Sequence, residues 1–434
     1  MSPLMAPAAP PVPPKPISVR GGASGITAQC DELVAMARRF GGAATDTLHA
    51  AWTLHGYLVH PGLAESALLD PVGYAAFEVD LLDALDGLHG LTWVGAQSGL
   101  IDGELRVAAA GYEAADQLYT DAHDVVLGLA RLPAALIAAA DVLVSTGDPI
   151  TAAEAGIARD PELADVVVDA LGIPGLLTAG ARLLPDGRGV VHRLGRDAGG
   201  VAGQAPRQLT DVLRDLDRRN DDTHHGAVDV RILTLPDGSR RAIVDITGTK
   251  SWSITATEDI TSLTTNGRAL VGDRTAYEQG VLAAMHDAGV RASDHVMLVG
   301  HSEGGLVAVN TARAAARSGA FNVTHVVTAG APVGLTVGQL PRKVNVLALE
   351  NSKDVVPHLD GVANPDRPNI TTASSAHGNG RVGDDHSLKD AYVPLAADVQ
   401  ASNNTSTRDF LSSASGYFEA TQVSTHTYQV TRTY

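Results

Sequence analysis

The spacing of apolar residues along the chain changes in character near residue 200. Before that point apolar positions recur three and four apart, as in "VDLLDALDGLHGL" and "AADQLYTDAHDVVLGLARL", and this period predicts amphipathic helices. After it, short runs rich in Val and Leu alternate with helical or loop stretches, as in "HVMLVG", "THVVTAGAP" and "VNVLALEN". Such runs are typical of strands buried on both faces of a parallel sheet. The pattern therefore predicts a helical domain followed by an α/β domain.

Local signals set the boundaries of these domains. Prolines crowd residues 1–22, which predicts a disordered or polyproline tail and no Sec signal, since no basic start leads into an unbroken apolar stretch. Residues 23–200 form the predicted helical domain and residues 201–434 the predicted α/β domain. Within the latter, residues 206–218 predict an amphipathic helix, and the "PDGS" turn at 236–239 predicts a hairpin. The stretch "TQVSTHTYQVTRTY" has the composition of a strand, but the pattern does not place it in a sheet.

Composition narrows the classes of protein that remain. The chain has 434 residues, 44% of them hydrophobic, which is ample for two packed domains. Its formal net charge of -17 argues against a nucleic-acid partner, because phosphate binding needs clustered Lys and Arg. The single cysteine, Cys30, excludes an internal disulfide framework and suits a small buried apolar position. The longest apolar run, residues 125–144, contains Arg131, Pro133 and Asp141, so we expect no transmembrane segment.

Candidate chemistry begins with "GHSEGG" at residues 300–305. A strand pattern precedes it and an Ala-rich helical pattern follows it, so Ser302 lies on a predicted strand-to-helix turn. Such a turn strains its central residue, and Gly300 and Gly304 remove side chains that would clash. With 45 glycines in the chain, a G-x-S-x-G string arises by accident in about one such chain in four. The surrounding pattern, more than the string itself, predicts that Ser302 is a nucleophile.

A serine nucleophile needs an imidazole to take its proton and a carboxylate to fix the tautomer of that imidazole. Asp354 follows a predicted strand at residues 344–350, where the acid of such a site belongs. His386 begins a helix-like segment after a Gly-rich loop, and we predict that it is the base. His377 stays open as an alternative base. His358 follows Asp354 too closely and is interpreted as structural or pocket-lining.

An acyl-transfer site also needs donors for the oxyanion. The first predicted donor is the main-chain N–H of Glu303, at the start of the helix that follows the serine. The second is Thr249, whose N–H and hydroxyl come directly after Gly248, a residue that permits a close backbone approach. The polar residues 253–272 come next, and we predict a mobile flap there that gates an apolar pocket.

Five motifs follow one another along the chain: "ITGTKSW", "GHSEGG", "TAGAPVG", "KDVVPHL" and "DDHSL". Their order resembles the class-three (fungal-type) lipases of the α/β-hydrolase superfamily, over about residues 227–399. The resemblance implies a mostly parallel α/β sheet with helices on both faces and a carboxylic ester hydrolase that needs no cofactor or metal. Its substrate would be a small-molecule or lipid ester. One departure is Thr247, which stands where the family usually has an arginine. The resemblance implies that Ser302 is the nucleophile, Asp354 the acid and His386 the base. It also implies that Thr249 and Glu303 form the oxyanion hole.

The helical half carries a second, shorter resemblance. Trp93-Val94-Gly95 stands at an apparent break between two predicted helices, and Tyr112 and Asp116 follow on the second. This spacing is similar to the WxG helical hairpins that type VII secretion systems export, over about residues 66–124. The similarity implies export and a secretion-system partner. In the alternative interpretation Trp93 fills a corner between helices, Tyr112 is an ordinary interface aromatic, and the protein stays in the cytoplasm.

Two classes of function remain open. The first is a serine esterase or lipase that works through an acyl-enzyme. The second is a secreted, type VII-associated binding or effector protein with a non-catalytic hydrolase fold, because a fold does not fix a function. No pair of carboxylates marks glycosidase chemistry. The Asp and His residues at 221–225 are interpreted as a polar linker between domains and not as a metal site.

Overall fold

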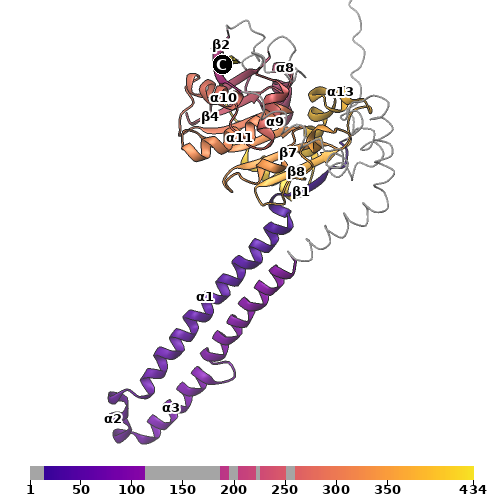
Figure 1. The fold of residues 1–434 in the computed structure, drawn as a ribbon. Helices are drawn as coiled ribbons and strands as arrows, with labels where there is room; N and C mark the ends of the chain where they lie inside the picture. Colours follow the sequence, from indigo (N-terminus) through magenta and orange to yellow (C-terminus); the bar gives the residue numbers. More distant parts are fainter. Residues whose placement is uncertain (1–13, 113–185, 195–203, 221–224, 251–259) are drawn as a thin grey trace, which may run out of the picture. The chain divides into compact units, whose positions relative to one another are not determined.

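The computed structural model describes residues 14–112, 186–194, 204–220, 225–250 and 260–434. The chain divides into two compact units, one of Ile26–His123 and the other of Met1–Gly25 with Asp124–Tyr434. Figure 1 shows the first as long helices and the second as a sheet layered with helices.

The helical unit is built from two antiparallel arms. One arm is α1 (Ile26–Leu58) and the other consists of α3 (Pro71–Asp86) and a helix over residues 91–112, with α2 (Pro61–Leu69) between the arms (Figure 1). Small buried side chains recur every seven residues along α1, which is the period of a close helix–helix seam. They are Cys30, Ala37, Ala44 and Ala51.

The prediction that a helix break lies at Trp93-Val94-Gly95 is wrong. These residues lie inside the helix of 91–112, and the break comes earlier, at residues 87–90. Gly95 has a packing role instead, since a Cβ there would lie 2.7 Å from Cγ of Leu48 on the opposite arm. Trp93 is 46% exposed and Tyr112 is 63% exposed. Asp116 lies outside the described residues.

Many large apolar side chains of the helical unit face solvent. Near the turn between the arms, Trp52, Val59, Leu68 and Leu69 are each 79% exposed or more, and Leu88, in the break at residues 87–90 of the second arm, is 83% exposed. Exposed apolar area on this scale is unusual for a surface without a binding role. None of the helices in the described ranges is long and apolar enough to cross a bilayer.

The second unit has a sheet whose strand order is β1-β8-β7-β6-β5-β4-β3-β9-β2. Strands β4 to β8 run parallel to one another, and β9 has the same direction because both β9 and β4 pair antiparallel with β3. Strands β1, β2 and β3 run the opposite way. The sheet is therefore mostly parallel, as predicted. The strands are β1 (Ser18–Gly21), β2 (Arg188–Arg193), β3 (Ala227–Thr234), β4 (Arg240–Ile246), β5 (His295–His301), β6 (Asn322–Ala329), β7 (Asn345–Asn351), β8 (Ile370–Ser375) and β9 (Gln422–Thr433).

Helices cover both faces of the sheet, as predicted. On one face the core contains residues of α9 (Leu263–Leu270), α10 (Ala276–Asp287) and α11 (Glu303–Ser318). On the other it contains residues of α8 (Leu209–Arg219), α14 (Val393–Ala401) and α15 (Thr405–Ser413). The shorter helical segments are η1 (Gly22–Ser24), α12 (Gly334–Val337), η3 (Val356–His358), α13 (Val382–Asp385), η4 (Leu388–Tyr392) and η5 (Ser415–Tyr417).

Two local predictions are wrong, and long-range strand pairing explains both. Residues 18–21, predicted as tail, form β1 on β8, and residues 188–193, predicted as part of the helical domain, form β2 on β9. Both strands are short, and their partners lie far away in sequence. Part of the predicted flap is packed as well: residues 260–272 include α9 and the buried Ile260, Ala269 and Leu270. Residues 253–259 lie outside the described ranges.

A buried charge network joins α8 to the sheet. Arg231 of β3 is fully buried and donates to Asp215 of α8 and to Asp245 of β4, with 2.8 Å between Nη2 of Arg231 and Oδ1 of Asp245. Burial raises the pKa of Asp245 to about 7. The positive charge of Arg231 lowers this pKa, and the negative charges of Asp229 and Asp215 raise it. The carboxyl of Asp245 therefore takes up a proton near neutral pH.

We expect Asp245→Asn to flatten the dependence of stability on pH. The pKa of Asp245 in the folded protein, about 7, lies above its ordinary value of 3.8, so between these values the folded state holds more protons than the unfolded state. The contribution of Asp245 to the free energy of unfolding thus falls as pH rises through this window and is constant above it. Asn is neutral throughout, and its oxygen can still accept from Arg231.

Urea midpoints of wild type and variant, measured at about pH 5 and about pH 8, give the two slopes. A wild-type midpoint that changes with pH as much as that of the variant contradicts this role for Asp245.

Candidate active site

Ser302 sits between β5 and α11 in a strained conformation. Its φ of 56° and ψ of -126° are rare for a side chain with a Cβ, and no other non-glycine residue in the described ranges has a positive φ. The N–H of Ser302 donates to the carbonyl of Ala329 on β6 at 2.9 Å, and its own carbonyl accepts from Gly305 at 2.9 Å. Strain of this kind costs about 1–3 kcal/mol and persists only where surrounding contacts hold it.

Gly300 and Gly304 allow the chain to pass closely around this turn. A Cβ on Gly300 would lie 2.1 Å from the carbonyl oxygen of Gly304, and a Cβ on Gly304 would lie 2.2 Å from that of Ile246 at the end of β4. Both contacts are with backbone, which cannot move away as a side chain can. The two glycines thus fix the distance between the serine turn and the end of β4.

Asp354 and His386 form a direct pair beyond the ends of the parallel strands. The distance from Nδ1 of His386 to Oδ2 of Asp354 is 2.6 Å, and only 2% of Asp354 is exposed. Because a carboxylate accepts, Nδ1 carries the hydrogen, and Nε2 is left as the basic nitrogen. The other oxygen, Oδ1, accepts the N–H of Val356 at 2.9 Å, so the carboxylate cannot rotate freely.

His386 lies beside the residue that precedes Ser302. The ring centroids of His301 and His386 are 4.5 Å apart, and His301 is adjacent to Ser302 in sequence. Within the described ranges the hydroxyl of Ser302 makes no hydrogen bond, and neither does Nε2 of His386. Serine, imidazole and carboxylate therefore gather at one edge of the sheet, and neither the hydroxyl oxygen of Ser302 nor Nε2 of His386 has a described side chain as partner.

The other two candidate histidines have different surroundings. His377 is buried, and its Nε2 lies 2.6 Å from Oδ2 of Asp398, so it belongs to a second His–Asp pair. Its main-chain N–H and C=O are bound by the side chain of Asn351. His358 ends the short 3-10 helix η3 that follows Asp354. The structure joins Asp354 to His386 and to neither of these.

The two predicted oxyanion donors meet, but the hydroxyl of Thr249 is occupied. It donates to Oε2 of Glu303 at 3.0 Å and accepts from Asn266 at 2.8 Å, so its hydrogen is directed to Glu303 in this structure and its predicted role as an oxyanion donor stays a prediction. The acceptor of this hydroxyl is the side chain of Glu303, the first residue of α11. The main-chain N–H of Thr249 makes no hydrogen bond to a described residue. The N–H of Glu303 belongs to the first turn of a helix, where donors lack intrahelical partners.

Two site residues had no signal in the sequence. Tyr392 is fully buried in η4, and its hydroxyl donates to Oδ2 of Asp354 at 2.5 Å, the oxygen that also accepts from His386. Burial and the adjacent carboxylate raise the pKa of Tyr392 well above 10, so the phenol keeps its proton. Asn351, at the end of β7, donates to the carbonyl of Asp385 at 2.7 Å and so ties the loop that carries His386 to the sheet.

If Asp354 orients the base, Tyr392→Phe should lower kcat about tenfold with little change in KM. A hydrogen bond to a charged group contributes about 1.5–3 kcal/mol. We expect only part of this free energy to serve in orienting the carboxylate, so the effect on kcat is smaller than the full value would give. Steady-state kinetics on an ester measures the change. Tyr417→Phe is the matched control, because its buried hydroxyl contacts Thr324 at 2.7 Å, outside the site. Equal kcat in the two variants contradicts a role for the Tyr392 hydroxyl.

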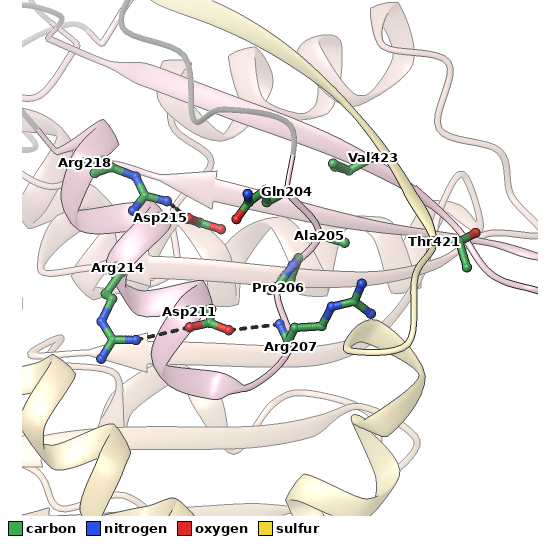
Figure 2. Close-up of a pocket in the computed structure, with 10 residues that line it drawn as sticks. All are labelled: Gln204, Ala205, Pro206, Arg207, Asp211, Arg214, Asp215, Arg218, Thr421 and Val423. Atoms are coloured by element: carbon green, nitrogen blue, oxygen red, sulfur yellow. Dashed lines mark hydrogen bonds and ion pairs between the residues drawn. The ribbon is translucent and has the colours of Figure 1, made fainter.

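A groove of about 870 Å³ lies beside α8, and no predicted site residue lines it. Figure 2 shows its walls: residues 204–207, one side of α8, and the start of β9. Arg214 pairs with Asp211 at 3.1 Å, and Arg218 pairs with Asp215. The guanidinium groups of Arg207, Arg214 and Arg218 lie well apart in the view, so they do not converge on one anion.

In the described part of the chain, no three His, Cys, Asp or Glu side chains are grouped so that they could bind a metal ion. Comparison with protein families found no family that matches the chain, and comparison with curated proteins found no match either.

Proposed function

We propose that the protein is a serine hydrolase of the α/β-hydrolase superfamily, similar to the class-three lipases, that cleaves carboxylic esters. The observation that carries the proposal is the Asp354–His386 pair, 2.6 Å from Nδ1 to Oδ2, beside the strained turn that holds Ser302. A fold does not need a serine at positive φ with a His–Asp pair beside it. Together they are the parts that acyl transfer requires.

In the first half of the proposed reaction, Oγ of Ser302 attacks the ester carbonyl while Nε2 of His386 takes the hydroxyl proton. The oxyanion that forms is held by the main-chain N–H groups of Thr249 and Glu303. Asp354 stabilises the imidazolium, and its carboxyl group is held in place by hydrogen bonds from Tyr392 and Val356. The C–O bond to the leaving alcohol then breaks, and His386 returns the proton to that oxygen.

In the second half, water attacks the acyl-enzyme. His386 takes a proton from the water, the same N–H groups hold the second oxyanion, and Oγ of Ser302 leaves with the proton from Nε2. The products are a carboxylic acid and an alcohol, and the enzyme returns to its starting state. No cofactor takes part in this chemistry. The substrate is a small-molecule or lipid ester.

Covalent labelling tests the proposal. A fluorophosphonate probe should label the wild type at Ser302, located by mass spectrometry of the labelled peptide, because phosphonylation needs the same activated hydroxyl. Ser302→Ala should not be labelled. Ser352→Ala is the matched control, since Ser352 is a half-buried serine two residues before Asp354, and it should label like the wild type. A wild type that stays unlabelled and cleaves no ester in a panel of varied acyl length refutes the assignment.

A second candidate function is a secreted, type VII-associated binding or effector protein. The exposed apolar side chains around the turn of the helical unit, Leu68 and Leu69 among them at 87% and 89% exposure, favour a binding role for that unit. Deletion of the Tyr112 to Asp116 signal tests whether the protein is exported, with the amount of protein in the culture medium as the measurement. Loss of the protein from the culture medium would support the secretion-system partner, and unchanged secretion would remove it.

A further inference from the structure

We infer that His301 is a positioning residue that holds the catalytic base through its main chain. The inference rests on the proposed function and adds a part to it. His301 is the residue before the nucleophile, and its Nε2 lies 2.9 Å from the carbonyl oxygen of His386. Because a carbonyl only accepts, Nε2 of His301 carries the hydrogen and donates it. Nδ1 of His301 is then the nitrogen without a proton.

The two ends of this hydrogen bond differ in how firmly the fold holds them. His301 ends β5 and is opposite Ala329 of β6 in the sheet, and only 6% of it is exposed. His386 lies in the short connection between α13 and η4. The bond therefore links the connection that carries the base to the strand that carries the nucleophile. It sets the distance between Ser302 and His386 from the backbone side.

Holding His386 by its carbonyl leaves its ring free for chemistry. Nδ1 is used by Asp354, and Nε2 must remain open for the serine proton. A side chain that bound the ring itself would occupy one of these nitrogens. The ring of His301 lies against the ring of His386 at 33° and against that of Tyr392 at 5.9 Å between centroids, so it restricts tilt of the imidazole without a polar contact to it.

Charge fits the same role. Burial, together with repulsion by His386 and Lys250, holds the pKa of His301 well below 6.5. His301 therefore stays neutral while His386 gains and loses a proton during turnover. It does not act as the base, because its Nε2 is a donor to a carbonyl and its Nδ1 is buried without a hydrogen-bond partner in the described ranges.

Two substitutions of nearly equal size and shape separate positioning from packing. His301→Gln keeps an N–H donor near the place of Nε2, whereas His301→Met fills similar space without a donor. Loss of one hydrogen bond with a displacement of the base should lower kcat of H301M about 10- to 100-fold with KM nearly unchanged. H301Q should keep kcat within about threefold of the wild type. His301→Phe, which can still stack on His386 but cannot donate, should behave like H301M.

The experiment is ester kinetics on all four full-length proteins, with their unfolding midpoints measured in parallel. A folded H301M or H301F with the kcat of H301Q overturns the inference. So does unfolding of both apolar variants beside a stable H301Q, since the bond would then serve folding and not positioning. Failure of the proposed function looks different, because the wild type itself would neither cleave esters nor take up the fluorophosphonate.

Discussion

Ser302→Ala should lower the rate of ester hydrolysis by about 10⁶-fold, the scale on which removal of a triad serine acts. The change deletes one oxygen, the one that forms the acyl-enzyme in the proposed mechanism. Ala has a Cβ like Ser, so the backbone conformation at φ 56° is no more strained in the variant than in the wild type. Stability should therefore change little. The residual rate comes from the oxyanion donors and from substrate binding.

Stopped assays with high enzyme concentration measure so large a loss, and circular dichroism confirms the fold. Ser352→Ala should retain the wild-type rate. Hydrolysis by Ser302→Ala at more than about a hundredth of the wild-type rate would assign the nucleophile to another residue.

Asp354→Asn should lower kcat by about 10⁴-fold, again with the fold retained. Oδ1 of Asp354 accepts the N–H of Val356, so the amide oxygen of Asn is drawn to that position. The NH₂ group then faces Nδ1 of His386 and the hydroxyl of Tyr392, both of which are donors in the wild type. Two donors facing each other repel, so the imidazole carries its hydrogen on Nε2 instead of Nδ1. A protonated Nε2 can no longer accept the serine proton.

The chain contains its own control for this substitution. Asp398→Asn makes the same change in the His377–Asp398 pair, whose contact is also 2.6 Å. Turnover should stay within a few-fold of the wild type there, because His377 is not joined to Asp354. Equal losses in the two variants would mean that the change acts through general destabilisation, and larger loss at Asp398 would exchange the roles of the two pairs.

The parallel core strands could be predicted because each meets a core on both faces. Along β5, Val296 and Leu298 belong to one core and Met297 and Val299 to the other, which explains why the run is apolar at every position instead of alternating. The same principle does not extend to β1 and β2. They lie at the two ends of the strand order, and the residues that pair with them are far along the chain.

The candidate site divides in the same way. Glycine spacing around Ser302 reflects backbone clashes within a few residues, so it can be found in the sequence. The hydroxyl of Thr249 is bound by Glu303, and Tyr392, in η4, donates to Asp354 in the loop after β7. Such contacts depend on side-chain directions at the meeting of distant segments, and no local pattern encodes them.

The position of β9 has a consequence for how the chain is made. β9 lies between β3 and β2, with Tyr428 opposite Val228, and is synthesised after every other strand of the sheet. Until it leaves the ribosome, β3 has one open edge and β2 has no neighbour in the sheet. A nascent chain in this interval exposes unpaired strand edges to other chains. The sheet should therefore be completed only once residues 422–433 have emerged from the ribosome, and messages truncated ahead of residue 422 should yield aggregates.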